Sequence, residues 1–274
     1  MITTPLACSN LAFDYGKQQV IKNINLNFEK GTFIGLIGPN GAGKSTLLNL
    51  LMGMIKPTKG DVNLYGQPLK QYKQRALARQ ISLVPQDVSI EYAFSVREIV
   101  AMGRNPHLGP FQPETKRDRE LIDLAMEKTD LLQMATRNVN QLSGGERQRV
   151  FIARSIAQEA PILLMDEPTA NLDLCHQLEV LSLVKALTED GQLAISAIHD
   201  LELASRFCDQ LILIHEGEIA AQGSPAEVLT KENLYQFFSI EAEVEPYRQD
   251  ENSIRVTALR SCNDYSSTNL KRND

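Results

Sequence analysis

The sequence predicts an α/β fold in which buried strands end at polar residues along one edge of a central sheet. Apolar runs of strand length lie at 33–37, 162–165 and 193–198, and each leads into a glycine-rich or polar segment. Helical patterns over 46–52 and 174–188 follow the first and second of these runs. Because α/β sheets bind ligands outside the carboxyl ends of their strands, we expect the functional residues at that edge.

Composition and charge limit the classes of protein to which the chain can belong. Its 274 residues, 43% of them apolar and 23% charged, are ordinary for a globular protein. A formal net charge of −6 provides no bulk attraction to nucleic acid or anionic lipid, although a local basic patch would be compatible with it. We therefore do not expect a nucleic acid partner.

The termini and the cysteines indicate a reduced, cytosolic setting. The N-terminus lacks a signal-peptide pattern, and no apolar stretch is long enough to span a bilayer. The cysteines lie far apart without a C-x-x-C pair, so they predict neither a zinc site nor a disulfide framework. We expect a cytosolic protein unless a partner holds it at a membrane.

The N-terminal segment is typical of an antiparallel β subdomain. Apolar residues recur over 6–14 and alternate with asparagines over 24–28, as in half-buried antiparallel strands. Tyr15 stands between them beside Gly16, where its ring is available to stack on a base. A loop tyrosine is also commonly a packing residue, so the local pattern leaves both interpretations open.

A glycine-rich loop identifies the central ligand. The pattern G-x-x-x-x-G-K-[ST] is matched in full, and its residues with the one that follows are Gly38, Pro39, Asn40, Gly41, Ala42, Gly43, Lys44, Ser45 and Thr46. A buried strand precedes it and a helix follows, which is the context of a P-loop NTPase with a RecA-like core. Backbone N–H groups and the helix dipole would hold phosphates, Lys44 would reach the β- and γ-phosphates, and Ser45 would ligate Mg²⁺.

A helical subdomain is expected as an insertion at about 87–160. Strands at 60–66 and 81–85 precede it, and the second strand places Gln86 at its end. Ser95 to Glu98 has the pattern of a capping box, and a charged helix is expected over 114–128. A further helix is expected over 149–158, opened by the turn Ser143, Gly144, Gly145 and Glu146. That turn is either a second anion-binding helix terminus or an ordinary N-cap.

Two carboxylates and a histidine lie at the ends of the later strands. Asp166 and Glu167 follow the run 162–165, and we expect them to point in opposite directions, Asp166 toward Mg²⁺ and Glu167 toward an attacking water. A helix N-terminal charge pair is the alternative interpretation. His199 ends the strand at 193–198, whereas His107, His176 and His215 are expected to be surface or packing residues.

The remaining residues complete one domain and add an extension. A hairpin over 211–219 and helical stretches near Pro225 and Lys231 are expected to complete a core that spans residues 1–240. Residues 241–274 form a C-terminal extension with a possible strand at 254–256, and its end from Ser261 is expected to be flexible.

Taken together, these motifs resemble the complete series of an ABC transporter ATPase subunit over nearly all of residues 1–240. The series consists of the P-loop, Gln86, Leu142 to Glu146, Leu164 to Pro168, Asn171 to Asp173, and His199. The resemblance implies a head-to-tail homodimer with ATP between the subunits. The P-loop of one subunit would then face the Ser143–Gly145 turn of the other.

The resemblance also implies a role for each matching residue. Tyr15 would stack on adenine, and the P-loop with Thr46 would hold the phosphates and Mg²⁺. Gln86 would sense the metal and the γ-phosphate, Asp166 would support Mg²⁺, and Glu167 would polarise the water. Asp173 would contact the other subunit, and His199 would hold the γ-phosphate.

The segment 95–107 and the ending 234–244 are similar to ATPases of iron-siderophore, haem and vitamin B12 importers. This similarity implies a separate integral membrane permease, indirectly an external substrate-binding protein, and a location at the cytoplasmic face of the membrane. An iron chelate is the first expected cargo, then haem or cobalamin, then zinc or manganese. We expect Phe94, Val96 and Ile99 to form the permease dock. A soluble ABC-type ATPase acting on DNA or ribosomes is the alternative.

Overall fold

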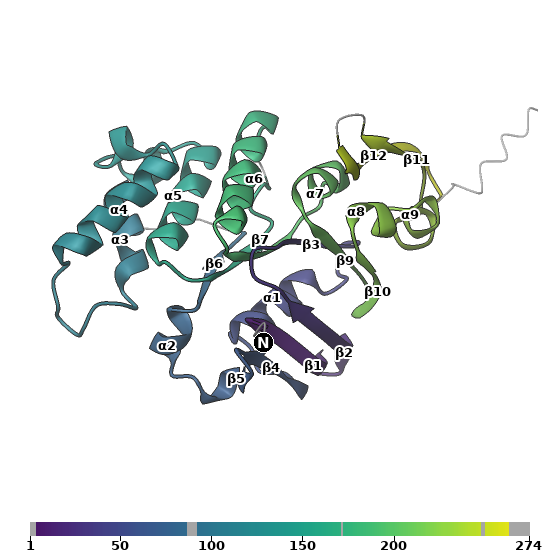
Figure 1. Cartoon of the computed structure of the whole chain (residues 1–274), viewed down its shortest axis with the longest axis horizontal. Coiled ribbons are helices and arrows are strands. Elements are labelled where there is room, and N and C mark those ends of the chain that lie inside the picture. The colour runs from purple at the N-terminus through teal and green to yellow at the C-terminus, as the bar shows by residue number, and fades with distance from the viewer. Residues whose placement is uncertain (1–3, 87–91, 171, 248–249, 263–274) are drawn as a thin grey trace, which may run out of the picture.

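The computed structural model describes residues 4–86, 92–170, 172–247 and 250–262 (Figure 1). Its main sheet has the strand order β10-β9-β3-β8-β7-β6. The strands are β3 (Phe33–Ile37), β6 (Ile81–Val84), β7 (Ile162–Asp166), β8 (Leu193–Ala197), β9 (Gln210–His215) and β10 (Glu218–Gly223). All pair in parallel except β10, which pairs antiparallel with β9. The expected α/β fold is confirmed.

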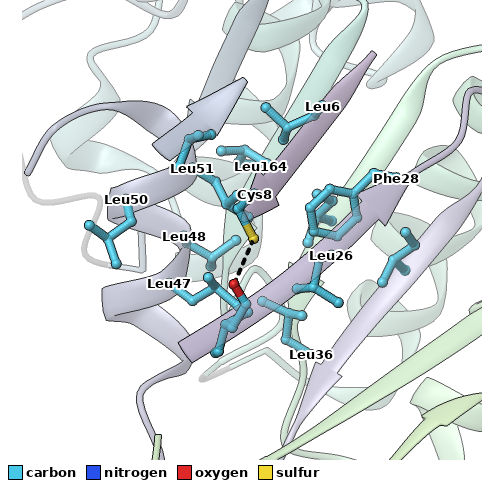
Figure 2. Packing of buried hydrophobic residues seen from close by; sticks show 14 of the residues in the cluster. Leu6, Cys8, Leu26, Phe28, Leu36, Leu47, Leu48, Leu50, Leu51 and Leu164 are labelled. Carbon is cyan, nitrogen blue, oxygen red and sulfur yellow. Dashed lines mark hydrogen bonds between the residues drawn. The ribbon is translucent and has the colours of Figure 1, made fainter. Parts of the chain in front are cut away.

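An antiparallel sheet stands beside the main one, with the order β2-β1-β4-β5. Its strands are β1 (Leu6–Tyr15), β2 (Gln18–Phe28), β4 (Lys59–Leu64) and β5 (Gln67–Pro68). Helix α1 (Lys44–Met52) lies between the sheets, because its leucines pack with the buried side chains of both. Figure 2 shows Leu6, Leu26 and Phe28 from the antiparallel strands facing the leucines of α1. This packing fixes the helix that follows the glycine-rich loop.

The helical part of the chain lies at one end of the molecule (Figure 1). It follows a 3-10 turn at Leu69–Gln71 and the short α2 (Gln74–Ala78). It contains α3 (Val96–Ala101), α4 (Lys116–Lys128) and α5 (Gly144–Ala157), with 3-10 turns at Met102–Arg104, Leu132–Met134 and Val139–Gln141. The Ser95 capping box is present at α3. Helix α5 begins five residues before the predicted 149, because Ser143 and Glu146 cap each other and draw both glycines into the first turn.

The remaining elements cover the other face and the far end of the main sheet. They are α6 (Leu174–Glu189), α7 (Leu201–Phe207), α8 (Pro225–Val228), α9 (Lys231–Phe238), β11 (Ile240–Tyr247) and β12 (Asp250–Ser261). The strand expected at 254–256 is part of β12, which pairs antiparallel with β11. Ile254 N–H donates to the buried Ser205 Oγ of α7 at 2.6 Å, so the hairpin is anchored to the domain. Ser261, where a flexible end was expected to begin, is the last residue of β12 and pairs with Ile240 of β11. The part of that end beyond Cys262, and Asn171, lie outside the described residues.

Burial contradicts most of the predicted docking set. Val96 and Ile99, predicted to dock a permease, are buried in the core of the helical part, where α3 packs against α4 and α5. Only Phe94 of that set retains partial exposure. Within the described residues, no helix is both long enough and apolar enough to cross a bilayer.

Candidate functional site

The glycine-rich loop is packed so closely that two of its glycines are required. Gly38 has φ +144°, and a Cβ atom there would lie 2.1 Å from the carbonyl oxygen of Ile214 in β9. Gly43 has φ +109°, and a Cβ atom there would lie 2.9 Å from Cδ1 of Ile21 in β2. Both conformations are strained for other residues. The loop is therefore held between β9 and β2, and α1 starts directly after it at Lys44.

Lys44 is a buried cation at this helix start, 5% exposed. Its Nζ donates to the carbonyl oxygens of Gly38 at 2.8 Å and Pro39 at 3.1 Å. Burial lowers the pKa of Lys44, while the nearby Glu167 and Asp166 carboxylates oppose that change. Phosphate oxygens in the loop would meet a desolvated ammonium, which attracts them more strongly than an exposed one would.

Ser45 and Asp166 provide a pair of oxygen ligands. Ser45 Oγ donates to Asp166 Oδ1 at 2.9 Å, and Asp166 is the last residue of β7. Burial raises the pKa of Asp166, which the Ser45 hydrogen bond partly offsets and the neighbouring Glu167 charge increases. Adjacent oxygen ligands of an octahedral Mg²⁺ lie about 3 Å apart, so this pair fits the ion. The negative charges of Asp166 and Glu167, which lie close together, would also favour a bound cation.

Glu167 lies at the centre of a hydrogen-bonded group. Gln86 Nε2 donates to Glu167 Oε2 at 2.6 Å, and His199 Nε2 is hydrogen-bonded to Glu167 Oε1. The Glu167 side chain is 16% exposed and that of His199 is 43% exposed. Each carboxylate oxygen therefore has its own partner, which fixes the orientation of the carboxylate.

Asp166 and Glu167 contact different side chains, but strand alternation, the expected reason for different directions, does not apply. Glu167 follows β7 rather than continuing it, and it has a left-handed backbone with φ 48°. Its carbonyl oxygen accepts from Ala170 N–H at 3.0 Å, so the chain turns here. This turn, and not strand alternation, directs the Glu167 side chain toward Gln86 and His199.

The sheet order explains why distant residues meet. The P-loop follows β3, His199 follows β8, Glu167 follows β7 and Gln86 follows β6. These strands are neighbours in the order β3-β8-β7-β6 and are parallel, so their carboxyl ends share one edge. The expectation of a site along this edge agrees with the positions of these residues.

The Ser143–Gly145 turn is the capped N-terminus of α5, as one of the two interpretations of this turn predicted. Ser143 caps α5 by accepting from Glu146 N–H at 3.3 Å, and Glu146 Oε2 accepts from Ser143 N–H at 2.8 Å. These hydrogen bonds lower the pKa of Glu146. Gly144 is exposed at the helix start, where free N–H groups and the dipole favour an anion.

Asp173 caps α6 and contacts a residue that sequence reasoning missed. Asp173 Oδ1 accepts from His176 N–H at 3.0 Å and is hydrogen-bonded to His176 Nδ1 at 2.7 Å. His176 was expected to be a surface or packing residue, but its ring also lies against Gly145. The available signal was its position three residues after a helix N-cap, where a side chain can bond back to the cap.

Tyr15 keeps an exposed ring at the end of β1. It is 54% exposed, and its ring meets that of Phe13 edge-on at 4.8 Å between centroids. Tyr15 pairs with Gln18 across the β1–β2 turn, and the strand then reaches Val20, whose carbonyl oxygen lies 3.1 Å from a Cβ placed on Gly43. Stacking on adenine remains a prediction that this geometry allows.

Comparison with known proteins decides the family. The model of the ABC transporter family matches residues 21–170, which is more than half of the chain. The chain belongs to the ABC transporter family. The matched residues include the P-loop, Gln86, the Ser143 turn, Asp166 and Glu167.

Curated relatives of this ABC protein are importer subunits. It is 42% identical over 230 residues to the cobalamin import ATP-binding protein BtuD of Halobacterium salinarum, covering 84% of this chain and 57% of that protein. It is 40% identical over 231 residues to the ferric enterobactin transport ATP-binding protein FepC of Escherichia coli, covering 84% of this chain and 85% of that protein. The chain thus spans little more than half the length of the first of these relatives.

Solved structures agree with the ABC cassette fold. One is a transporter assigned to the metal-chelate type, in an inward-facing conformation, with a TM-score of 0.82, 31% identity, and coverage of 94% of this chain and 98% of that one. Another is the dimeric structure of MJ0796, a bacterial ABC transporter cassette, with a TM-score of 0.72, 30% identity, and coverage of 80% and 97%.

Proposed function

We propose that the chain is the ATP-hydrolysing subunit of an importer that moves an iron chelate through a separate membrane permease. The observation that carries the hydrolytic part is Glu167, held by Gln86 and His199 beside Lys44 and the Ser45–Asp166 pair. This group combines a phosphate anchor, oxygen ligands for a metal and a fixed carboxylate. Such a set is what phosphoryl transfer to water requires.

The residues act by positioning and by charge. Lys44 and the backbone N–H groups at the start of α1 hold the β- and γ-phosphates. Mg²⁺, held by Ser45 and Asp166 with Gln86 nearby, would neutralise charge on the phosphate oxygens. Glu167 accepts a hydrogen bond from the attacking water and aligns it, and His199 steadies that carboxylate and the γ-phosphate.

A second subunit would complete the site. The hydrogen bonds of Ser143 and Glu146 stay within their own turn, so the anion-binding end of α5 has capacity for an external phosphate. In a head-to-tail homodimer, the Ser143–Gly145 turn would cover ATP on the P-loop of the partner. The dimeric structure of the MJ0796 cassette, which is 30% identical to this chain, supports dimer formation.

The permease dock is proposed around the exposed residues before α3. Tyr92 is 71% exposed and its ring lies 6.3 Å from that of Phe94. Both follow Gln86 in the chain, six and eight residues after it. Phe94 N–H donates to the carbonyl oxygen of Tyr92, and the carbonyl oxygen of Phe94 accepts from Val139 N–H. These hydrogen bonds fix the backbone under this surface.

The variant Phe94→Asp should uncouple ATP hydrolysis from transport. A charge on this surface should weaken apolar docking by about 2 kcal/mol, or roughly thirtyfold in affinity. Uptake of a radioiron-labelled siderophore by cells should fall, while the purified subunit keeps its hydrolysis rate. Leu132→Asp is the matched control, because Leu132 is an exposed apolar residue, 46% exposed, elsewhere on the helical part. Normal uptake by Phe94→Asp would contradict the dock.

The cargo is proposed from relatives. FepC is named for ferric enterobactin and BtuD for cobalamin, so the same cells should also be tested with labelled haem and cobalamin. Uptake of each labelled compound would be compared between normal cells and cells that lack this protein. A loss that affects only the iron chelate would support the proposal. Loss of haem or cobalamin uptake instead would replace the iron chelate by that cargo.

A further inference from the structure

His176 contacts two segments that the proposed dimer would present to its partner. It lies in the first turn of α6, where its N–H and its Nδ1 both reach Asp173 Oδ1, at 3.0 and 2.7 Å. One oxygen of the Asp173 carboxylate is therefore held twice by the same residue. The Asp173 side chain is nevertheless 67% exposed, so its other oxygen can meet another molecule.

The other side of the imidazole packs on the start of α5. A Cβ atom at Gly145 would lie 3.0 Å from Cγ and 3.1 Å from Cδ2 of His176. Gly145 is buried and has ordinary helical backbone, so a Cβ atom there would press on the His176 ring, which would have to shift by a few tenths of an ångström. The ring thus occupies the space that the missing side chain leaves.

An ion pair about one turn further along also joins α5 to α6. Arg149 Nη1 lies 3.7 Å from Glu179 Oε2 and 4.0 Å from Asp130 Oδ2, and the Arg149 side chain is 16% exposed. Residues 145 and 149 share one face of α5, as 176 and 179 share one face of α6. The N-terminal parts of α5 and α6 therefore approach each other through these side chains, with His176 against the Ser143–Gly145 turn.

These contacts join the helical part of the chain to the sheet domain. The Ser143–Gly145 turn begins α5 of the helical part, and Asp173 begins α6, which packs on the main sheet. We propose that His176 is a positioning residue that holds Asp173 and the Ser143–Gly145 turn in one fixed arrangement, so that each subunit presents both to its partner's ATP. This inference rests on the head-to-tail dimer of the proposed function.

The test compares dimer formation with nucleotide binding by single subunits, in the Glu167→Gln protein so that ATP persists. Analytical ultracentrifugation in ATP gives the dimer Kd, and titration with a fluorescent ATP analogue at protein concentrations below that Kd gives the affinity of one subunit. His176→Ala should raise the dimer Kd about tenfold, the effect of losing a hydrogen bond to a charged group. The affinity of one subunit for ATP should stay within about twofold, because His176 does not contact the P-loop residues.

Two further variants separate positioning from general stability. His176→Asn places an amide nitrogen where Nδ1 stands, so it should restore the dimer Kd to within about threefold of the parent. Glu179→Gln removes only the outer, half-exposed ion pair with Arg149 and should change the dimer Kd by less than about threefold.

Results that contradict the role of His176 differ from the result that contradicts the proposed dimer. An unchanged dimer Kd in His176→Ala would overturn the inference. So would a parallel loss of ATP affinity and unfolding temperature, because that would indicate a merely structural residue. A Glu167→Gln parent that stays monomeric in ATP would instead overturn the proposed dimer, and this inference with it.

Discussion

Replacing Lys44 by alanine should abolish useful nucleotide binding. The ammonium is 5% exposed, and it is the cation that opposes the Asp166 and Glu167 charges where the phosphates would lie. Losing a charge-assisted contact to phosphate in a desolvated site should cost about 3 kcal/mol or more, which is over a hundredfold in affinity. Calorimetric titration of ATP and Mg²⁺ into the purified protein measures this directly.

The matched control for this variant is Lys56→Ala. Lys56 is exposed in the segment after α1, so its removal should leave ATP affinity unchanged within about twofold. Circular dichroism should confirm that Lys44→Ala is folded. A folded Lys44→Ala protein with normal ATP affinity would show that the P-loop lysine does not hold the phosphates.

Replacing Glu167 by glutamine should separate binding from hydrolysis. The amide has the shape of the carboxylate and can still bond to Gln86 and His199, but it is a much poorer acceptor for the proton of an attacking water. Loss of general base assistance should lower the hydrolysis rate about a thousandfold, while ATP affinity stays within a few-fold. Phosphate release in single-turnover conditions measures the rate, and size-exclusion chromatography in ATP should show a persistent dimer.

Glu202→Gln makes the same chemical change on the exposed face of α7, so its turnover should be normal. Should Glu167→Gln hydrolyse ATP at a near-normal rate, Glu167 would not be the base, and another residue would have to align the water.

The sequence predicted the strand ends well because strong local signals mark them. Buried apolar runs lead into the P-loop, Asp166 and His199, and parallel pairing then brings their ends to one edge. Strand alternation does not explain the direction of the Glu167 side chain. Glu167 has a left-handed backbone conformation in a turn, which the residue pattern alone does not show.

Other differences arise from packing between distant segments. The predicted start of α5 is too late, because paired glycines disfavour a helix. The capping box formed by Ser143 and Glu146 offsets that preference, so the helix begins at Gly144. Val96 and Ile99 were expected at a surface, but α4 and α5 cover them. The contact of His176 with Gly145 joins helices that only the tertiary fold brings together.

The central claim is that this ABC protein powers a membrane transporter, and co-purification tests it most directly. The Glu167→Gln protein would be isolated in ATP from detergent-solubilised membranes, and its partners identified by mass spectrometry. The account predicts a polytopic permease, whose identity would also indicate the cargo. Recovery of ribosomal or DNA-repair proteins without any permease would contradict it and favour a soluble ABC-type ATPase.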